Sequence, residues 1–100
     1  MRWEYKEVSI ALDITYDDAV NKAYPGQWVT KRYNKILAKE FQHTGSEGWQ
    51  VDQDTTFANM VNNGNVEYKV LNQPFPKFLF FPDRKIHYKS VRVRMKRATT

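Results

Sequence analysis

The sequence predicts a single α+β domain in which one long helix packs on one face of a four- to five-stranded, mainly antiparallel sheet. Apolar residues recur at helical spacing over residues 27–44, and they alternate with polar residues in segments near both ends of the chain. Glycines and prolines separate these segments. One hundred residues are enough for one domain, residues 1–100, with a modest hydrophobic core.

The first predicted strand covers residues 2–12. Its later even-numbered positions are apolar, and small or polar residues lie between them. Trp3 and Tyr5 have the opposite parity, so the apolar phase changes near Lys6-Glu7. We expect a β-bulge there, or a strand that is covered on both faces at one end.

The longest helix is predicted for residues 27–44, where five apolar residues form one stripe: Val29, Tyr33, Ile36, Leu37 and Phe41. We expect the helix to stop at Gly45, because a left-handed backbone at the C′ position suits glycine. Trp49 would then bring a large ring to the junction between helix and sheet. The preceding segment 13–24 is ambiguous, since its aspartates are placed to cap a short helix.

A β-hairpin is predicted for residues 55–61 and 66–71. The odd-numbered positions from Trp49 to Val61 are largely apolar, which indicates an extended strand, and alternation resumes after Asn65. Between the two segments stands Asn63-Gly64, and Asn-Gly is a strong short-range hairpin signal.

Two further strands are predicted toward the end of the chain. Residues 77–81 are apolar on both parities, so either both faces are covered or one face meets another chain. Residues 86–97 form the last strand, whose apolar phase changes near Lys89-Ser90 and indicates a second bulge. The predicted core of the domain is Val8, Ile10, Leu12, Val29, Tyr33, Ile36, Leu37, Phe41, Trp49, Val51, Phe57, Val91 and Val93.

The charge is distributed unevenly along the chain. Residues 1–54 hold seven basic and nine acidic residues, whereas residues 55–100 hold nine basic and two acidic ones. Such asymmetry favours an anionic partner, with nucleic acid as the first candidate. The alternative is an edge strand that its basic side chains protect from aggregation.

We therefore predict a nucleic-acid-binding surface of seven basic residues: Arg84, Lys85, Lys89, Arg92, Arg94, Lys96 and Arg97. Arg92, Arg94 and Lys96 would share one face of the last strand, about 6–7 Å apart, which is similar to the separation of phosphates along a nucleic-acid strand. Tyr88 or Phe78 would stack on bases if the target is single-stranded. Lysines spaced four apart on the helix would join this surface only if their face adjoined the last strand.

The alternative hypothesis is a protein-binding or self-associating module that uses an apolar edge strand. Its candidate surface is Phe78, Leu79, Phe80 and Phe81. In either case we expect a binding protein and not an enzyme.

Other chemistries have little support in the sequence. The chain has no cysteine, its two histidines lie on different predicted elements, and the glycines do not form a phosphate-binding loop. We therefore expect no cofactor, no metal site and no catalytic residue, although Asp52 and Asp54 would share one strand face that could bind a cation. No apolar run approaches the length of a membrane span, and a cytoplasmic location is the default expectation.

Three short pieces of the chain carry a family resemblance. They are Trp3-Glu4-Tyr5-Lys6 in the first strand, Gly45-x-Glu47-Gly48-Trp49 after the helix, and Met95-Lys96-Arg97 near the end. Their order resembles a family of small bacterial and phage domains of unknown function, whose members read roughly EYK, LGxEGWEL and FKR. The resemblance implies a strand, a helix and a short antiparallel sheet, and it implies no enzyme activity, cofactor or site residue.

Overall fold

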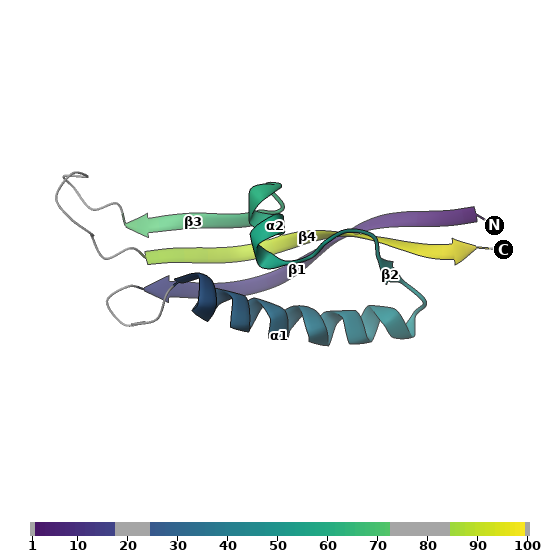
Figure 1. The fold of residues 1–100 in the computed structure, drawn as a ribbon, viewed down its shortest axis with the longest axis horizontal. Coiled ribbons are helices and arrows are strands. Elements are labelled where there is room, and N and C mark those ends of the chain that lie inside the picture. Colours follow the sequence, from purple (N-terminus) through teal and green to yellow (C-terminus); the bar gives the residue numbers. More distant parts are fainter. Residues whose placement is uncertain (1, 18–24, 73–84, 100) are drawn as a thin grey trace.

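The computed structural model describes residues 2–17, 25–72 and 85–99. Within these ranges the elements follow in the order β1 (Arg2–Asp17), α1 (Pro25–Ser46), β2 (Gln50–Val51), α2 (Phe57–Asn62), β3 (Val66–Asn72) and β4 (Lys85–Thr99). The four described strands form one antiparallel sheet, and the long helix α1 lies against it (Figure 1). The predicted α+β fold class is confirmed.

Strand β4 is the centre of the sheet. It pairs with β1 along its whole length, from Arg2 opposite Thr99 to Asp17 opposite Lys85. Its other edge is shared, because β2 pairs near the carboxyl end of β4 and β3 pairs near the amino end. The two long strands make an elongated molecule of 60 × 20 × 16 Å, with both chain ends side by side (Figure 1).

The two faces of the sheet have different environments. On one face, which we call the covered face, alternate residues of β1 and β4 are buried with Val29, Tyr33 and Leu37 of α1. Phe57 and Met60 of α2 pack with the same core. The opposite face, which we call the open face, carries the exposed residues between them, and no described helix packs on it.

The sheet contains two register shifts. Between β3 and β4, Glu67 pairs with Ser90 and Tyr68 pairs with Tyr88, so Lys89 is an extra residue and the predicted bulge near Lys89-Ser90 is confirmed. In β1 the shift lies between Ala11 and Ile14, where Asp13 has a positive φ of 48°. The predicted bulge near Lys6-Glu7 is wrong, since Trp3 and Tyr5 simply face the open side in continuous register.

Helix α1 ends at Ser46, two residues later than predicted. The N–H of Trp49 donates to the carbonyl of Thr44 at 3.2 Å, and the N–H of Gly48 donates to that of Gly45 at 3.0 Å. This pair of bonds is a Schellman motif in which Gly48, with a φ of 87°, is the left-handed C′ residue. The prediction that Gly45 stops the helix is therefore wrong, because the second glycine supplies the required conformation.

The predicted strand 55–61 is a helix, α2, so the predicted hairpin is wrong. Phe57, Met60 and Val61 are spaced as neighbours on one helical face, and Met60 is fully buried. Gly64 has a φ of 74°, and its N–H donates to the carbonyl of Val61 while that of Asn65 donates to Met60. The Asn-Gly pair thus ends a helix by a second Schellman motif and does not turn a hairpin.

Most of the predicted core packs as expected. Seven predicted residues are buried: Ile10, Leu12, Val29, Tyr33, Leu37, Val91 and Val93. Six are partly buried and pack against them: Val8, Ile36, Phe41, Trp49, Val51 and Phe57. Five buried apolar residues were not predicted: Ile14, Tyr16, Met60, Val66 and Met95. Ile14 and Tyr16 are buried because β1 continues to Asp17, through a segment for which a short helix was one predicted option.

Some predictions fall on residues that the structure does not describe. The predicted strand 77–81 and the part of segment 13–24 beyond Asp17 lie outside the described residues. Neither described helix has both the length and the apolar character needed to cross a membrane.

Candidate nucleic-acid interface on the open face

Two aromatic side chains stand on the open face at the amino end of β1. Trp3 is 38% exposed and Tyr5 is 60% exposed, while the residues between and beside them, Glu4 and Lys6, point to the covered side. Tyr5 lies opposite Lys96 of β4 in the sheet register. The two side chains therefore project from one strand, with their Cα atoms about 6–7 Å apart.

A row of cations runs beside these rings on β4. Arg92, Arg94 and Lys96 alternate with the buried Val93 and Met95, so all three lie on the open face as predicted. Arg92 and Arg94 are exposed, whereas Lys96 is partly covered and places its Nζ 4.7 Å from the centre of the Trp3 ring. The row and the rings thus form one continuous surface, which we call the aromatic–basic strip.

Asp52 partly neutralises this strip. Its carboxylate lies 3.4 Å from Nε of Arg94 and 3.4 Å from Nζ of Lys96, and the backbone N–H of Asp52 donates to the Arg94 carbonyl. Arg92 forms no ion pair with any acid in the described ranges. Its Nη2 donates instead to the carbonyl of Gly64 at 3.1 Å. Arg92 is therefore the least compensated cation of the row.

The structure does not bring all seven predicted basic residues together. Arg97 lies on the covered side, where it pairs with Glu4 at 2.6 Å and stacks on Trp49 at 4.6 Å. Its odd parity places it with Met95 and not with Lys96. Lys89 lies at the bulge and pairs with Glu67 at 3.6 Å. Lys85 lies at the far end of β4, and Arg84 is outside the described residues.

The residues predicted to stack on bases are not the ones on this surface. Tyr88 faces the covered side and packs edge-on against Phe57, with ring centres 5.5 Å apart. Phe78 lies outside the described residues, as does the whole predicted protein interface of Phe78, Leu79, Phe80 and Phe81. Trp3 and Tyr5 were not predicted as stacking residues. Their parity, which they share with Glu7 and Ser9, nevertheless places them on the polar side of the strand.

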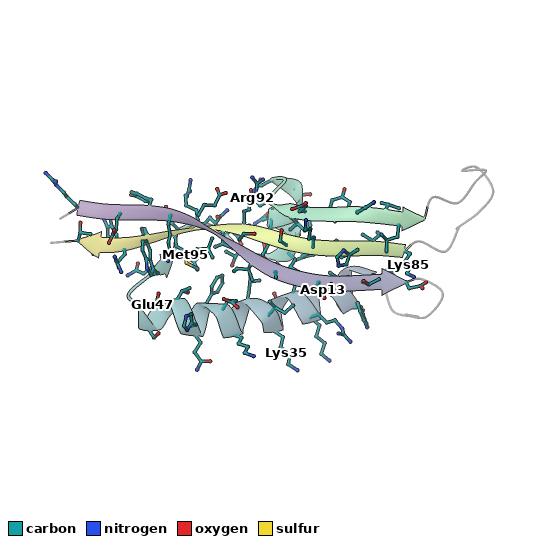
Figure 2. The ribbon with its side chains drawn as sticks, turned by 180° about the vertical axis from the view of Figure 1, so that it is seen from behind. Asp13, Lys35, Glu47, Lys85, Arg92 and Met95 are labelled. Atoms are coloured by element: carbon teal, nitrogen blue, oxygen red, sulfur yellow. The ribbon has the colours of Figure 1, made fainter. Side chains whose placement is uncertain are left out.

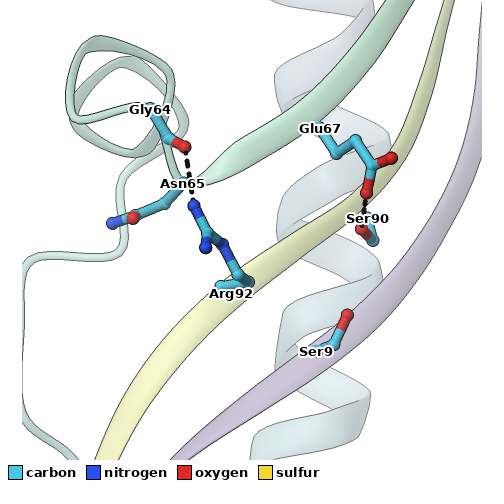
Figure 3. A pocket seen from close by; sticks show the side chains of 6 residues that line it. All are labelled: Ser9, Gly64, Asn65, Glu67, Ser90 and Arg92. Atoms are coloured by element: carbon cyan, nitrogen blue, oxygen red, sulfur yellow. Dashed lines mark hydrogen bonds between the residues drawn. The ribbon is translucent and has the colours of Figure 1, made fainter.

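A shallow hollow of about 360 Å³ lies on the open face beside Arg92. It is lined by six residues from the three neighbouring strands and the turn before β3: Ser9, Gly64, Asn65, Glu67, Ser90 and Arg92. Figure 3 shows the Arg92 guanidinium directed at Gly64 and the Glu67 carboxylate directed at Ser90, with Ser9 on the next strand. The Asn65 side chain points away from Arg92 and donates to Met60 Sδ at 3.7 Å.

The helical lysines do not join this surface. Lys31, Lys35 and Lys39 are exposed on α1, which packs on the covered face. Figure 2 shows Lys35 pointing away from the sheet. The condition under which the helix and the last strand would form one basic surface is therefore not met.

Two titratable groups near α2 have altered acidities. Burial raises the pKa of Tyr33 to about 12, with a smaller contribution from the Asp54 carboxylate, and the Tyr33 hydroxyl donates to the Thr55 carbonyl at 2.6 Å. The backbone N–H of Thr56, which donates to Asp54 at 3.0 Å, lowers the pKa of Asp54. Both groups form hydrogen bonds with the residues that precede α2, Thr55 and Thr56, and not with the aromatic–basic strip.

The described residues offer no metal centre. No group of three or more histidines, aspartates or glutamates lies together in the described ranges. His87 contacts Asp13 at 2.8 Å, and His43 lies 3.8 Å from Glu47. Asp52 and Asp54 have separate partners, the first with two cations of β4 and the second with Thr56 and Asn59.

No protein-family model matches the chain, and searches of curated proteins and of solved structures found no match either. The family resemblance carried by the three short motifs therefore stays a prediction.

Proposed function

We propose that this protein binds single-stranded nucleic acid on the aromatic–basic strip of the open face. The observation that carries this proposal is the exposure of Trp3 and Tyr5 beside Arg92, Arg94 and Lys96 on one sheet face. Proteins that bind single strands combine a basic track for the backbone with aromatic rings on which bases stack. A sheet face is also a common platform for such stacking.

The exposed rings favour a single strand over a duplex. A base must be unstacked from its neighbours before it can lie on Trp3 or Tyr5, and unpaired strands offer such bases. Stacking on an aromatic ring contributes about 1–3 kcal/mol for each base. Lys96 beside Trp3 holds the indole on one side and leaves a cation next to the stacked base.

The row on β4 suits the phosphates of the same strand. Its members repeat every second residue, and Arg92 and Arg94 are exposed. Because Asp52 already pairs with Arg94 and Lys96, and Arg94 Nη2 also donates to the Asp52 carbonyl at 3.2 Å, we expect only moderate affinity, carried mostly by Arg92. Phosphate contacts release counterions, so the affinity should fall steeply as salt rises.

Charge reversal on the open face tests this function. We expect Arg92→Glu combined with Arg94→Glu to abolish the binding of a fluorescein-labelled 12-nucleotide oligothymidine, measured by fluorescence anisotropy at low salt. The wild type should bind with a log K that falls linearly with log salt, at roughly 0.7 per phosphate contact for a single strand. An oligouridine of the same length separates an RNA preference from a DNA preference.

The matched control is Lys35→Glu combined with Lys39→Glu, which makes the same change in net charge on the outside of α1. This variant should keep most of the affinity, because its residues lie on the helix that packs on the covered face. Equal losses in the two double variants would show a general charge effect and no defined surface. Unchanged binding by the open-face variant would remove the proposal.

A further inference from the structure

Arg92 and Glu67 face the same hollow from neighbouring strands, and they offer opposite hydrogen-bonding chemistry. The Arg92 guanidinium carries five N–H donors, and its one described hydrogen bond, to the carbonyl of Gly64, uses a single nitrogen. The Glu67 carboxylate offers two acceptor oxygens. A ligand that fills the space between them must therefore present acceptors toward β4 and donors toward β3.

The existing contacts of Glu67 are weak enough to be exchanged. One carboxylate oxygen lies 3.6 Å from Lys89 Nζ, and both side chains are about two-thirds exposed, at 65% for Glu67 and 68% for Lys89. Such exposed ion pairs contribute little to stability. The other oxygen accepts from Ser90 Oγ at 3.4 Å, beyond the usual range for this kind of bond.

Guanine is the nucleobase whose edges match both sides of the hollow. Its O6 and N7 atoms are the acceptors that arginine binds most often. Its N1–H and N2 amino groups lie side by side and match the two oxygens of a carboxylate, whereas adenine, cytosine and uracil each present one donor group on that edge. A hollow of about 360 Å³ falls within the size range of small-molecule sites.

We propose that the hollow between Arg92 and Glu67 is a guanine-binding site. This inference rests on the proposed function, because the guanine would belong to a strand held on the aromatic–basic strip. Where the strand places a guanine here, Arg92 binds O6 and N7 in place of a phosphate, and Glu67 accepts from N1–H and the N2 amino group. Ser9 of the hollow lies four residues from Tyr5 on the same strand face, about 13 Å away, so one short strand reaches both places.

Two measurements test the site separately from the strip. In the first, GMP, AMP, CMP and UMP are titrated into the ¹⁵N-labelled protein, and amide shifts are followed by NMR. GMP should shift the amides of Glu67, Ser90 and Arg92 at a concentration at least about fivefold lower than the other three nucleotides. In the second, a 12-nucleotide oligothymidine with one central guanine should bind at least about fivefold more tightly than oligothymidine itself.

The decisive variant is Glu67→Gln, with Glu7→Gln as its matched control on the same face. Glu67→Gln replaces one acceptor by a donor, so it should remove the guanine preference while oligothymidine still binds. Glu7→Gln removes the same charge outside the hollow and should keep the preference. Inosine lacks the N2 amino group, so inosine in place of the central guanine should bind more weakly in the wild type and equally well in Glu67→Gln.

The outcomes distinguish this site from the proposed function. If GMP shifts the amides of the hollow but no oligonucleotide binds, the guanine site is supported. The proposal that the aromatic–basic strip binds single strands is then overturned. If oligothymidine binds but guanine gives no advantage, or if Glu67→Gln keeps the advantage, the guanine site is overturned. Shifts of equal size with all four nucleotides also overturn it, because they would report phosphate binding alone.

Discussion

The two faces of the β1–β4 ribbon are built from alternate residues of the same strands, yet they meet different surroundings. On the covered face Val91, Val93 and Met95 have no exposed surface. On the open face their neighbours in sequence, Arg92 and Arg94, are exposed to solvent. The period of two in a strand is therefore enough to separate residues that hold the fold together from residues available for binding.

Trp49 and Trp3, at the same end of the β1–β4 ribbon, show the same difference between the two faces within one residue type. Trp49 packs on the covered side between Lys6, with Nζ 4.1 Å from the ring centre, and Arg97 at 4.6 Å. Trp3 stands on the open face, is 38% exposed and has the Lys96 ammonium beside its ring. An aromatic ring thus serves packing or recognition according to the side of the strand that carries it.

The largest expected effect is the difference between the two faces in what their residues contribute to the free energy of unfolding. Met95→Ala removes a fully buried side chain from the covered face, so we expect the free energy of unfolding to fall by about 2–5 kcal/mol. Arg94→Ala on the open face should change it by less than about 1 kcal/mol, because the Arg94 side chain of its ion pair with Asp52 is 61% exposed. Urea denaturation followed by circular dichroism measures both. Equal losses would mean that the open face is also part of the core.

A smaller difference in stability is expected between substitutions of the two tryptophans. Trp49→Ala removes a half-buried ring and two cation–π contacts, so we expect a loss of about 2 kcal/mol, less than full burial would give. Trp3→Ala should cost less than about 1 kcal/mol in stability but weaken the binding of oligothymidine about tenfold. A thermal denaturation curve and the anisotropy titration give the two numbers. Wild-type binding by Trp3→Ala would count against stacking on the open face.

The smallest expected effect concerns pH and the tyrosine at the centre of the covered side. The pKa of Tyr33 is about 12 in the folded protein, and an unfolded tyrosine ionises near pH 10. The raised pKa means that the neutral phenol stabilises the fold below pH 10, and that this stabilisation is lost as pH rises from 10 to 12. We expect a loss of about 1 kcal/mol at pH 11 from this group alone.

Substitution isolates that contribution. Tyr33→Phe should lose stability at pH 8, since the hydroxyl no longer donates to the Thr55 carbonyl, but it should lose less than the wild type between pH 9 and pH 11. Tyr5→Phe is the matched control on the open face, where the tyrosine is 60% exposed. Urea midpoints at the three pH values provide the comparison. The same alkaline slope in wild type and Tyr33→Phe would contradict the assigned burial.

Much of the fold and part of the candidate site follow from the sequence. The stripe from Val29 to Phe41 predicts α1, and the alternation after Lys89 predicts both the buried side of β4 and the exposed Arg92–Lys96 row. The sequence does not distinguish the α2 helix from a strand, because Phe57 and Val61 also fit the parity of a strand and only the buried Met60 breaks it. Trp3 and Tyr5 were missed because an apolar ring suggests a core position.

The sequence by itself determined the periodicity of the elements and the distribution of charge. It shows a helical stripe, two strands with alternating faces, and a carboxyl half rich in bases. Only the tertiary structure decided which acid meets which base. Asp52 reaches Arg94 and Lys96, and Glu4 reaches Arg97, because antiparallel pairing places β2 and β1 on either side of β4. Local periodicity depends on neighbours within one turn or one pleat, whereas these pairs join residues more than forty positions apart through the register of the sheet.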